Sequence, residues 1–209
     1  MMWNWLVSGL LLKSTIYLYD GSPFYPNSEV LWNFVDSEKI NFMGVSAKYI
    51  DALSKENINI IGKYKLKNLE TIGSTGSPLI HESFDYIYSN IKKDVSVASL
   101  SGGTDIVGCF VGGNPISAVR RGEIQGPILG MDVHVYDENA NTIKNEKGEL
   151  VCIKSFPSMP LFFWNDNNNE KYHDAYFNKY ENVWCHGDYI LKTENDGFII
   201  FGRSDATLN

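Results

Sequence analysis

The sequence predicts an α/β fold in two parts: a parallel-sheet α/β subdomain over residues 1–110 and a smaller antiparallel, β-rich subdomain over residues 111–209. The first part alternates short apolar strand patterns with amphipathic helical patterns, which is typical of a largely parallel sheet. After residue 110 glycine becomes frequent, and clusters of turn-forming residues separate the strand patterns. That texture is typical of hairpins.

In the first part we expect helices and strands to alternate. The apolar run 2–12 predicts a buried helix, because it is shorter than the ~20 residues that a membrane-spanning helix needs. Ser28 and Ser46 are candidate N-caps, each followed by a helical pattern. A further helix is expected over 80–91, and strands are expected over 15–19, 40–45, 69–74 and 95–100.

In the second part we expect four strands, over 131–136, 149–154, 184–191 and 198–202. Turn-forming clusters at 137–141 and 194–197 lie between them. The segment 166–170, rich in Asn and Asp, predicts a polar loop.

Composition and charge exclude several classes of partner. A net charge of −7 disfavours a surface for nucleic acid or anionic membrane, which would be basic. Three widely spaced cysteines without a CxxC pattern indicate buried thiols in a reducing, cytoplasmic compartment. The four histidines are dispersed, which argues against a zinc site or a His-based triad, and no Walker A or GxSxG motif is present.

Two small polar loops follow predicted strands, where ligands of open α/β sheets bind. One is Gly76-Ser77-Pro78 and the other is Ser101-Gly102-Gly103-Thr104-Asp105. Glycine lets a ligand approach the main chain, the Thr104 hydroxyl suits a phosphate, and the Asp105 carboxylate suits a metal ion. The alternative is that both loops are tight turns with satisfied caps.

Two charged residues also occupy unusual places. Asp188 lies inside a strand pattern, where it could accept hydrogen bonds from the two hydroxyls of a ribose. Arg203 follows an apolar strand and would emerge at its end. The alternatives are an aspartate that caps a turn and an arginine in a surface ion pair.

Taken in order, four motifs resemble those of the adenylate-forming acyl-CoA synthetase superfamily: Gly76-Ser77-Pro78, Ser101 to Asp105, His186-Gly187-Asp188 and Gly202-Arg203-Ser204-Asp205. The resemblance covers essentially the whole chain. Several other stretches are most similar to the acetoacetate–CoA ligase family within it, namely 2–10, 19–23, 112–115, 156–160 and 184–188.

The resemblance implies a two-step reaction, in which an acid and ATP give an acyl-adenylate and CoA then displaces AMP. Mg²⁺ would be the cofactor, ATP and CoA the co-substrates, and small molecules the only partners. The acid would be acetoacetate, with another short-chain acid as the alternative. A truncated, non-catalytic nucleotide-binding domain is a further alternative.

The resemblance also implies roles for single residues. Gly76, Ser77 and Pro78 would lie along the adenosine. Thr104 would contact phosphate, and Asp105 stands where most of the superfamily has a glutamate that helps to hold Mg²⁺. Asp188 would bind the ribose, Arg203 the ribose or phosphate, and Asp205 would be the hinge to a C-terminal domain. The segment 99–104 would pass beside the adenine and the acyl group; it consists of Ser99, Leu100, Ser101, Gly102, Gly103 and Thr104.

Gly102 has a further implied role. Relatives specific for acetate have a tryptophan at the matching position, so Gly102 would leave the acyl pocket open for a longer acid. The alternative is that Gly102 permits a tight turn. The phosphate-binding loop and the C-terminal domain with its lysine are not found in these residues. We therefore expect an internal fragment, inactive alone, with activity belonging to the full-length parent.

Overall fold

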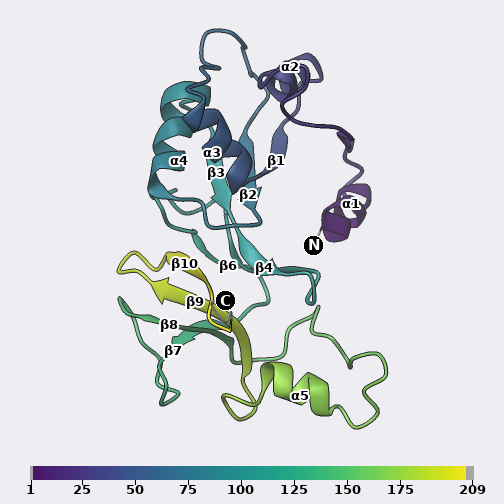
Figure 1. Ribbon diagram of the computed structural model, residues 1–209, viewed down its shortest axis with the longest axis vertical. Helices are drawn as coiled ribbons and strands as arrows, with labels where there is room; N and C mark the ends of the chain where they lie inside the picture. Colours follow the sequence, from purple (N-terminus) through teal and green to yellow (C-terminus); the bar gives the residue numbers. More distant parts are fainter. Residues whose placement is uncertain (1, 206–209) are drawn as a thin grey trace.

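The computed structural model describes residues 2–205, and side chains from residue 7 onward. Its first part is built on a three-stranded parallel sheet with the order β1-β2-β3. These strands are β1 (Phe42–Ser46), β2 (Thr71–Thr75) and β3 (Ser96–Ser99). Because all three run in the same direction, their carboxyl ends meet at one edge of the sheet (Figure 1). The predicted parallel α/β arrangement is confirmed.

Helices cover this sheet: α2 (Val30–Ser37), α3 (Ala47–Lys55) and α4 (His81–Tyr86), which continues as a π-helical turn, η1 (Ile87–Ile91). Ser46 caps α3, since its hydroxyl oxygen accepts a hydrogen bond from the Tyr49 N–H at 3.2 Å. Ser28 does not cap α2, because that helix begins after Glu29 and the Ser28 hydroxyl donates to Glu56 instead. Fully buried residues of the core between helices and sheet include Trp32, Ile50, Leu53, Leu69, Ile72 and Ile87.

Two predictions near the N-terminus were wrong. The helix α1 (Met2–Leu11) forms, but its outer residues are not buried: Leu11 is 83% exposed and Leu12, just after it, 75%. Residues 15–19 were predicted as a strand but have no strand partner in the described part of the chain. Instead, the Tyr17 ring packs edge-on against Phe34, with ring centroids 5.5 Å apart.

The second part consists of two antiparallel sheets. The first has the order β4-β5-β6 and the second the order β10-β9-β8-β7, so the predicted β-rich second part is confirmed. The four strands of the larger sheet were all predicted, within two residues at each end. The strands are β4 (Ser101–Gly103), β5 (Gly108–Gly112), β6 (Gly126–Pro127), β7 (Val133–Tyr136), β8 (Lys147–Cys152), β9 (Trp184–Lys192) and β10 (Phe198–Arg203).

The helix α5 (Glu170–Tyr176) was not predicted, because the polar run before it indicates a loop. Asp166 explains how the helix starts: its carboxylate accepts hydrogen bonds from the N–H groups of Lys171 and Tyr172. At the other end, the Tyr176 ring stacks on Trp184 of β9 at 3.6 Å between centroids. Aromatic packing therefore holds α5 against the larger sheet.

The change between the two parts falls near residue 100. One apolar core extends from Trp32 to Val97, and another begins at Ile106. The strand β5 contains residue 110, where the sequence suggested the boundary. Figure 1 shows the small β4-β5-β6 sheet between the parallel sheet and the larger antiparallel sheet. No helix in the described residues is long and apolar enough to cross a membrane.

Candidate functional site

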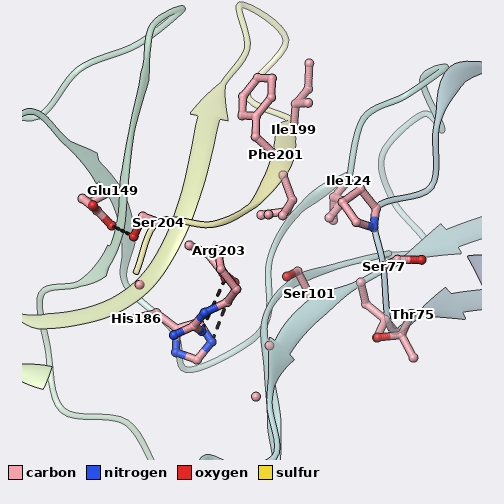
Figure 2. Close-up of a pocket in the computed structure, with 18 of the residues that line it drawn as sticks. Thr75, Ser77, Ser101, Ile124, Glu149, His186, Ile199, Phe201, Arg203 and Ser204 are labelled. Carbon is pink, nitrogen blue, oxygen red and sulfur yellow. Dashed lines mark hydrogen bonds and ion pairs between the residues drawn. The ribbon is translucent and has the colours of Figure 1, made fainter. Parts of the chain in front are cut away.

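A cavity of about 1330 Å³ lies where the two parts of the molecule meet. Its walls come from the ends of β2 and β3, from β4, and from β9 and β10, so residues far apart in the sequence face the same space (Figure 2). The cavity is larger than the 300–1,000 Å³ that is common for small-molecule sites. All the residues singled out from the sequence line it: Gly76, Ser77, Pro78, Ser99, Leu100, Ser101, Gly102, Gly103, Thr104, Asp105, Asp188, Arg203 and Asp205.

The end of β2 and the step from β3 to β4 form one wall. Gly76 has a φ of +86°, a left-handed conformation that favours glycine, so the chain turns sharply after Thr75. The Leu100 N–H donates to the Ser74 carbonyl at 3.0 Å, which ties the second loop to the first. Thr104 and Asp105 are both exposed at the end of that loop. Main-chain and hydroxyl groups of both loops can therefore contact the same ligand.

Gly102 leaves no room for a side chain beside the main chain of β5, and a side chain at position 103 would have to displace Asp105. A Cβ on Gly102 would lie 2.1 Å from the Gly108 carbonyl oxygen of β5. A Cβ on Gly103 would lie 1.9 Å from an oxygen of the Asp105 carboxylate. Close pairing of β4 with β5 thus supplies a reason for glycine at 102 that does not involve an acid. The acyl-pocket role of Gly102 stays a prediction. A Gly102→Trp variant would not distinguish an open acyl pocket from close strand pairing, because the first atom of its side chain would already clash with β5.

Asp105 is held from one side by Tyr176. The Tyr176 hydroxyl donates to Asp105 Oδ2 at 2.7 Å. Burial, and then this bond to a carboxylate, raise the pKa of Tyr176 well above its ordinary value, so the tyrosine stays a donor. Among the described residues, no group of three or more His, Cys, Asp or Glu is arranged so that it could hold a metal ion by itself.

Asp188 lies on the opposite wall, in β9, and only 7% of it is exposed. Two groups that can carry positive charge face it: Arg203 Nη1 is 3.5 Å from Oδ1, and His186 Nε2 is 3.8 Å from Oδ2. Both contacts are long, so burial dominates and raises the pKa of Asp188 above its usual range. Burial likewise lowers the pKa of His186. Asp188 is thus a buried carboxylate whose hydrogen-bonding capacity its neighbours do not fill.

Arg203 ends β10 at the mouth of the cavity. Its guanidinium makes two hydrogen bonds to the Asp205 carboxylate, one of them from Nε at 2.8 Å. Gly187 has a φ of +78°, and a Cβ there would lie 2.8 Å from Arg203 Nη2, so glycine at 187 leaves space for the guanidinium. Arg203 can therefore present positive charge to a ligand between the two walls.

Sequence reasoning missed other residues that line the cavity: Glu149, Lys179, Tyr176, His186 and the apolar pair Ile124 and Phe201. Glu149 gave no clear signal, because it opens its predicted strand, and only the structure shows that it is buried. The histidine lies in a motif that was noted, but only metal and nucleophile roles were weighed for it. Lys179 and Tyr176 carried no signal, because their position depends on the unpredicted helix α5.

The chain is similar to known proteins over its whole length. No protein-family model matches the chain. Over 209 residues it is 53% identical to an acetoacetyl-coenzyme A synthetase of Rhizobium meliloti, and over 210 residues 46% identical to that of Mus musculus. Each alignment covers all of this chain. Among solved structures, acetoacetyl-CoA synthetase from Streptomyces lividans has a TM-score of 0.90 and 41% identity over 100% of this chain. The chain is homologous to acetoacetyl-CoA synthetases.

The chain spans about a third of the length of the acetoacetyl-CoA synthetases it matches: 32% and 31% of the two sequences and 33% of the solved chain. A solved structure of much lower identity shares the fold. A crystal structure of an anthranilate CoA ligase in complex with anthranoyl-AMP has a TM-score of 0.74 over 94% of this chain, at 17% identity. That likeness shows the fold alone. The expectation of a parallel-sheet α/β part followed by a β-rich part is confirmed.

Proposed function

We propose that this chain forms the nucleotide- and acid-binding part of an AMP-forming ligase that joins acetoacetate to CoA. One observation carries the proposal. Four separate segments that resemble nucleotide-binding motifs line a single cavity, and the sequence around them is 53% identical, over the whole chain, to an acetoacetyl-coenzyme A synthetase.

The reaction has two steps. A carboxylate oxygen of the acid attacks the α-phosphorus of ATP, a new P–O bond forms, and the bond to pyrophosphate breaks. The sulfur of CoA then attacks the acyl carbon and loses its proton, the C–S bond forms, and AMP leaves with the bridging oxygen. The first step brings two anions together, so it gains chiefly from positioning and from stabilisation of charge.

The walls of the cavity suit those two needs. The main chain of Gly76, Ser77 and Pro78 offers a surface for the adenosine, and the buried carboxylate of Asp188 can accept hydrogen bonds from both ribose hydroxyls. On the phosphate side, Thr104 supplies a hydroxyl and Arg203 a positive charge. Asp205, two residues after Arg203 in the chain, would be the pivot at which a further domain would turn.

The residues present also fit a bound Mg²⁺. Magnesium sites in phosphate chemistry commonly use one or two carboxylates together with substrate phosphates and waters. Asp105 is exposed to the cavity, and one of its oxygens is already fixed by Tyr176 at 2.7 Å. Its carboxylate would hold the ion, which when bound would neutralise charge on the phosphates.

We propose that ATP, CoA and acetoacetate are the only partners of the site, with no nucleic acid and no membrane, and that the enzyme works in the cytoplasm. The three cysteines, at 109, 152 and 185, are thiols and not halves of disulfides, which suits a reducing compartment.

Exchange of radioactive pyrophosphate into ATP tests this function in the full-length protein, because exchange requires reversible adenylate formation. Acetoacetate should support exchange at lower concentration than acetate, propionate or butyrate. Exchange with another short acid, and not with acetoacetate, would change the substrate and keep the reaction class. Absence of exchange with every acid, in a folded protein that binds ATP, would refute the proposal.

A further inference from the structure

Glu149 is a buried carboxylate that the nucleotide chemistry does not require. It lies in β8, whose other residues from Gly148 to Cys152 are buried too, and only 5% of it is exposed. Pairing between β8 and β9 is irregular just after it, since Glu149 faces Tyr189 while Val151 already faces Cys185. A buried charge persists only where partners compensate for its lost hydration. The partners of Glu149 therefore indicate its purpose.

Each oxygen of this carboxylate has one close partner. Lys179 Nζ donates to Oε1 at 2.6 Å, from the chain that follows α5. The Ser204 hydroxyl donates to Oε2 at 2.7 Å, from the chain that follows β10. The Cys185 thiol is 3.8 Å from the same Oε2. Three segments thus meet at Glu149, and one of them carries Arg203 and Asp205.

Ser204 is fixed at two points. Its side chain reaches Glu149, and its N–H donates to the Gly187 carbonyl of β9 at 2.8 Å. The residues on either side of it project into the cavity, where the Arg203 guanidinium faces Asp188 and pairs with Asp205. Figure 2 shows the Glu149–Ser204 hydrogen bond next to Arg203. Displacement of Ser204 would consequently displace both charged neighbours.

We infer that Glu149 is a positioning residue: through Ser204 it fixes the segment 203–205, and so sets where Arg203 meets the phosphates and where Asp205 begins the onward chain. Lys179 neutralises the carboxylate, so that its second oxygen can serve as an acceptor for Ser204 without an unpaired charge in the interior. The inference that Glu149 holds residues 203–205 in place rests on contacts alone, while its consequence for nucleotide binding rests on the proposed function.

Hydrogen exchange read by mass spectrometry tests the positioning role without any ligand. In the full-length protein, Ser204→Ala should speed exchange in a peptide over 199–205 by about tenfold, because a hydrogen bond to a charged group is lost. Ser28→Ala is the matched control, since it removes a hydroxyl that donates to Glu56 at 2.5 Å, at the other end of the molecule. It should leave that peptide unchanged.

Titration with ATP, read by calorimetry, gives the functional arm. Ser204→Ala should weaken ATP binding about three- to tenfold, with Glu149→Ala similar and Glu149→Gln smaller, because glutamine keeps an acceptor for the hydroxyl. Changing both Glu149 and Ser204 to Ala should weaken binding by less than the product of the two single effects. If Glu149→Ala does not fold, Ser204→Ala still decides.

The outcomes separate the two proposals. Unchanged exchange over 199–205 in Ser204→Ala overturns the positioning role, whatever the nucleotide result. Faster exchange with unchanged ATP affinity also overturns it, because the segment would then be ordered without serving the site. Failure of the unmodified protein to bind ATP removes the proposed function and the nucleotide consequence, and the exchange result alone then decides whether Glu149 orders the segment.

Discussion

Replacing Asp188 with asparagine should separate the stability of the fold from its affinity for nucleotide. The carboxylate is only 7% exposed, and its two nearest polar neighbours, Arg203 and His186, are 3.5 and 3.8 Å away. Burial outweighs both neighbours and raises the pKa of Asp188. A raised folded-state pKa means that this group stabilises the fold below its unfolded pKa and loses that contribution as pH rises through the folded value. At any pH above that folded value, Asp188 thus destabilises the free protein.

The size of the binding effect follows from the bonds at stake. If Asp188 accepts hydrogen bonds from the ribose, each charge-assisted bond contributes about 1.5–3 kcal/mol. One such bond corresponds to about a ten- to 150-fold change in the dissociation constant. An asparagine side chain at this position keeps the shape and one acceptor but loses the charge. We therefore expect ATP binding to weaken at least about tenfold, while the affinity for the acid changes little.

Two measurements on the full-length protein check this reasoning. Thermal unfolding without ligand should give an Asp188→Asn midpoint equal to or above that of the unmodified protein at neutral pH. Calorimetric titration should give the weakened ATP affinity. A lower midpoint with unchanged ATP affinity would refute both halves of the reasoning and make Asp188 a structural residue.

Three other substitutions test the site from different sides. Burial lowers the pKa of His186, so the free energy of unfolding should decrease as the pH falls below about 6.5. His186→Asn should make the decrease between about pH 7.5 and about pH 5 smaller, and an unchanged dependence of unfolding free energy on pH would contradict this. Gly102→Ala should lower stability by about 1–3 kcal/mol in denaturant unfolding, because its Cβ would lie 2.1 Å from the Gly108 oxygen; an unaltered midpoint would show that β4 and β5 separate easily. Asp205→Pro should change adenylate formation and thioester formation by different factors if the residue is a hinge, since proline fixes φ there; equal factors in single-turnover assays would remove that role.

The regular parts of the fold were predictable from the sequence, and the irregular parts were not. Strands such as β7 and β10 are short runs rich in Val, Ile, Phe and Tyr beside turn-forming residues, and a local pattern of that kind is sufficient to predict them. The short strand β4 contains two glycines, and it is a strand only because β5 lies beside it. The helix α5 follows a polar run, and it depends on the stacking of Tyr176 against Trp184. Tertiary contacts decide such segments, and the local sequence does not record them.

The site divides in the same way. Gly76, Asp188 and Arg203 could be singled out because each residue type is unusual for its predicted place, at a strand end or inside a strand. These residues meet in one cavity because of the order of the strands in the sheets. The sequence indicated that meeting only through the family resemblance of its motifs. Glu149 and Lys179 belong to the site through a contact between segments 30 residues apart, which local patterns do not reveal. Only the structure shows that Glu149 is buried, and that burial is what indicates its importance.

Transfer of labelled oxygen tests the central claim most directly. Acetoacetate carrying ¹⁸O in its carboxylate is incubated with ATP, CoA, Mg²⁺ and the full-length protein, and the AMP is examined by mass spectrometry. Because the acyl-adenylate shares one carboxylate oxygen with the α-phosphate, the account predicts that every AMP formed with acetoacetyl-CoA carries one ¹⁸O. Formation of ADP and phosphate, or of unlabelled AMP alongside the thioester, would contradict it.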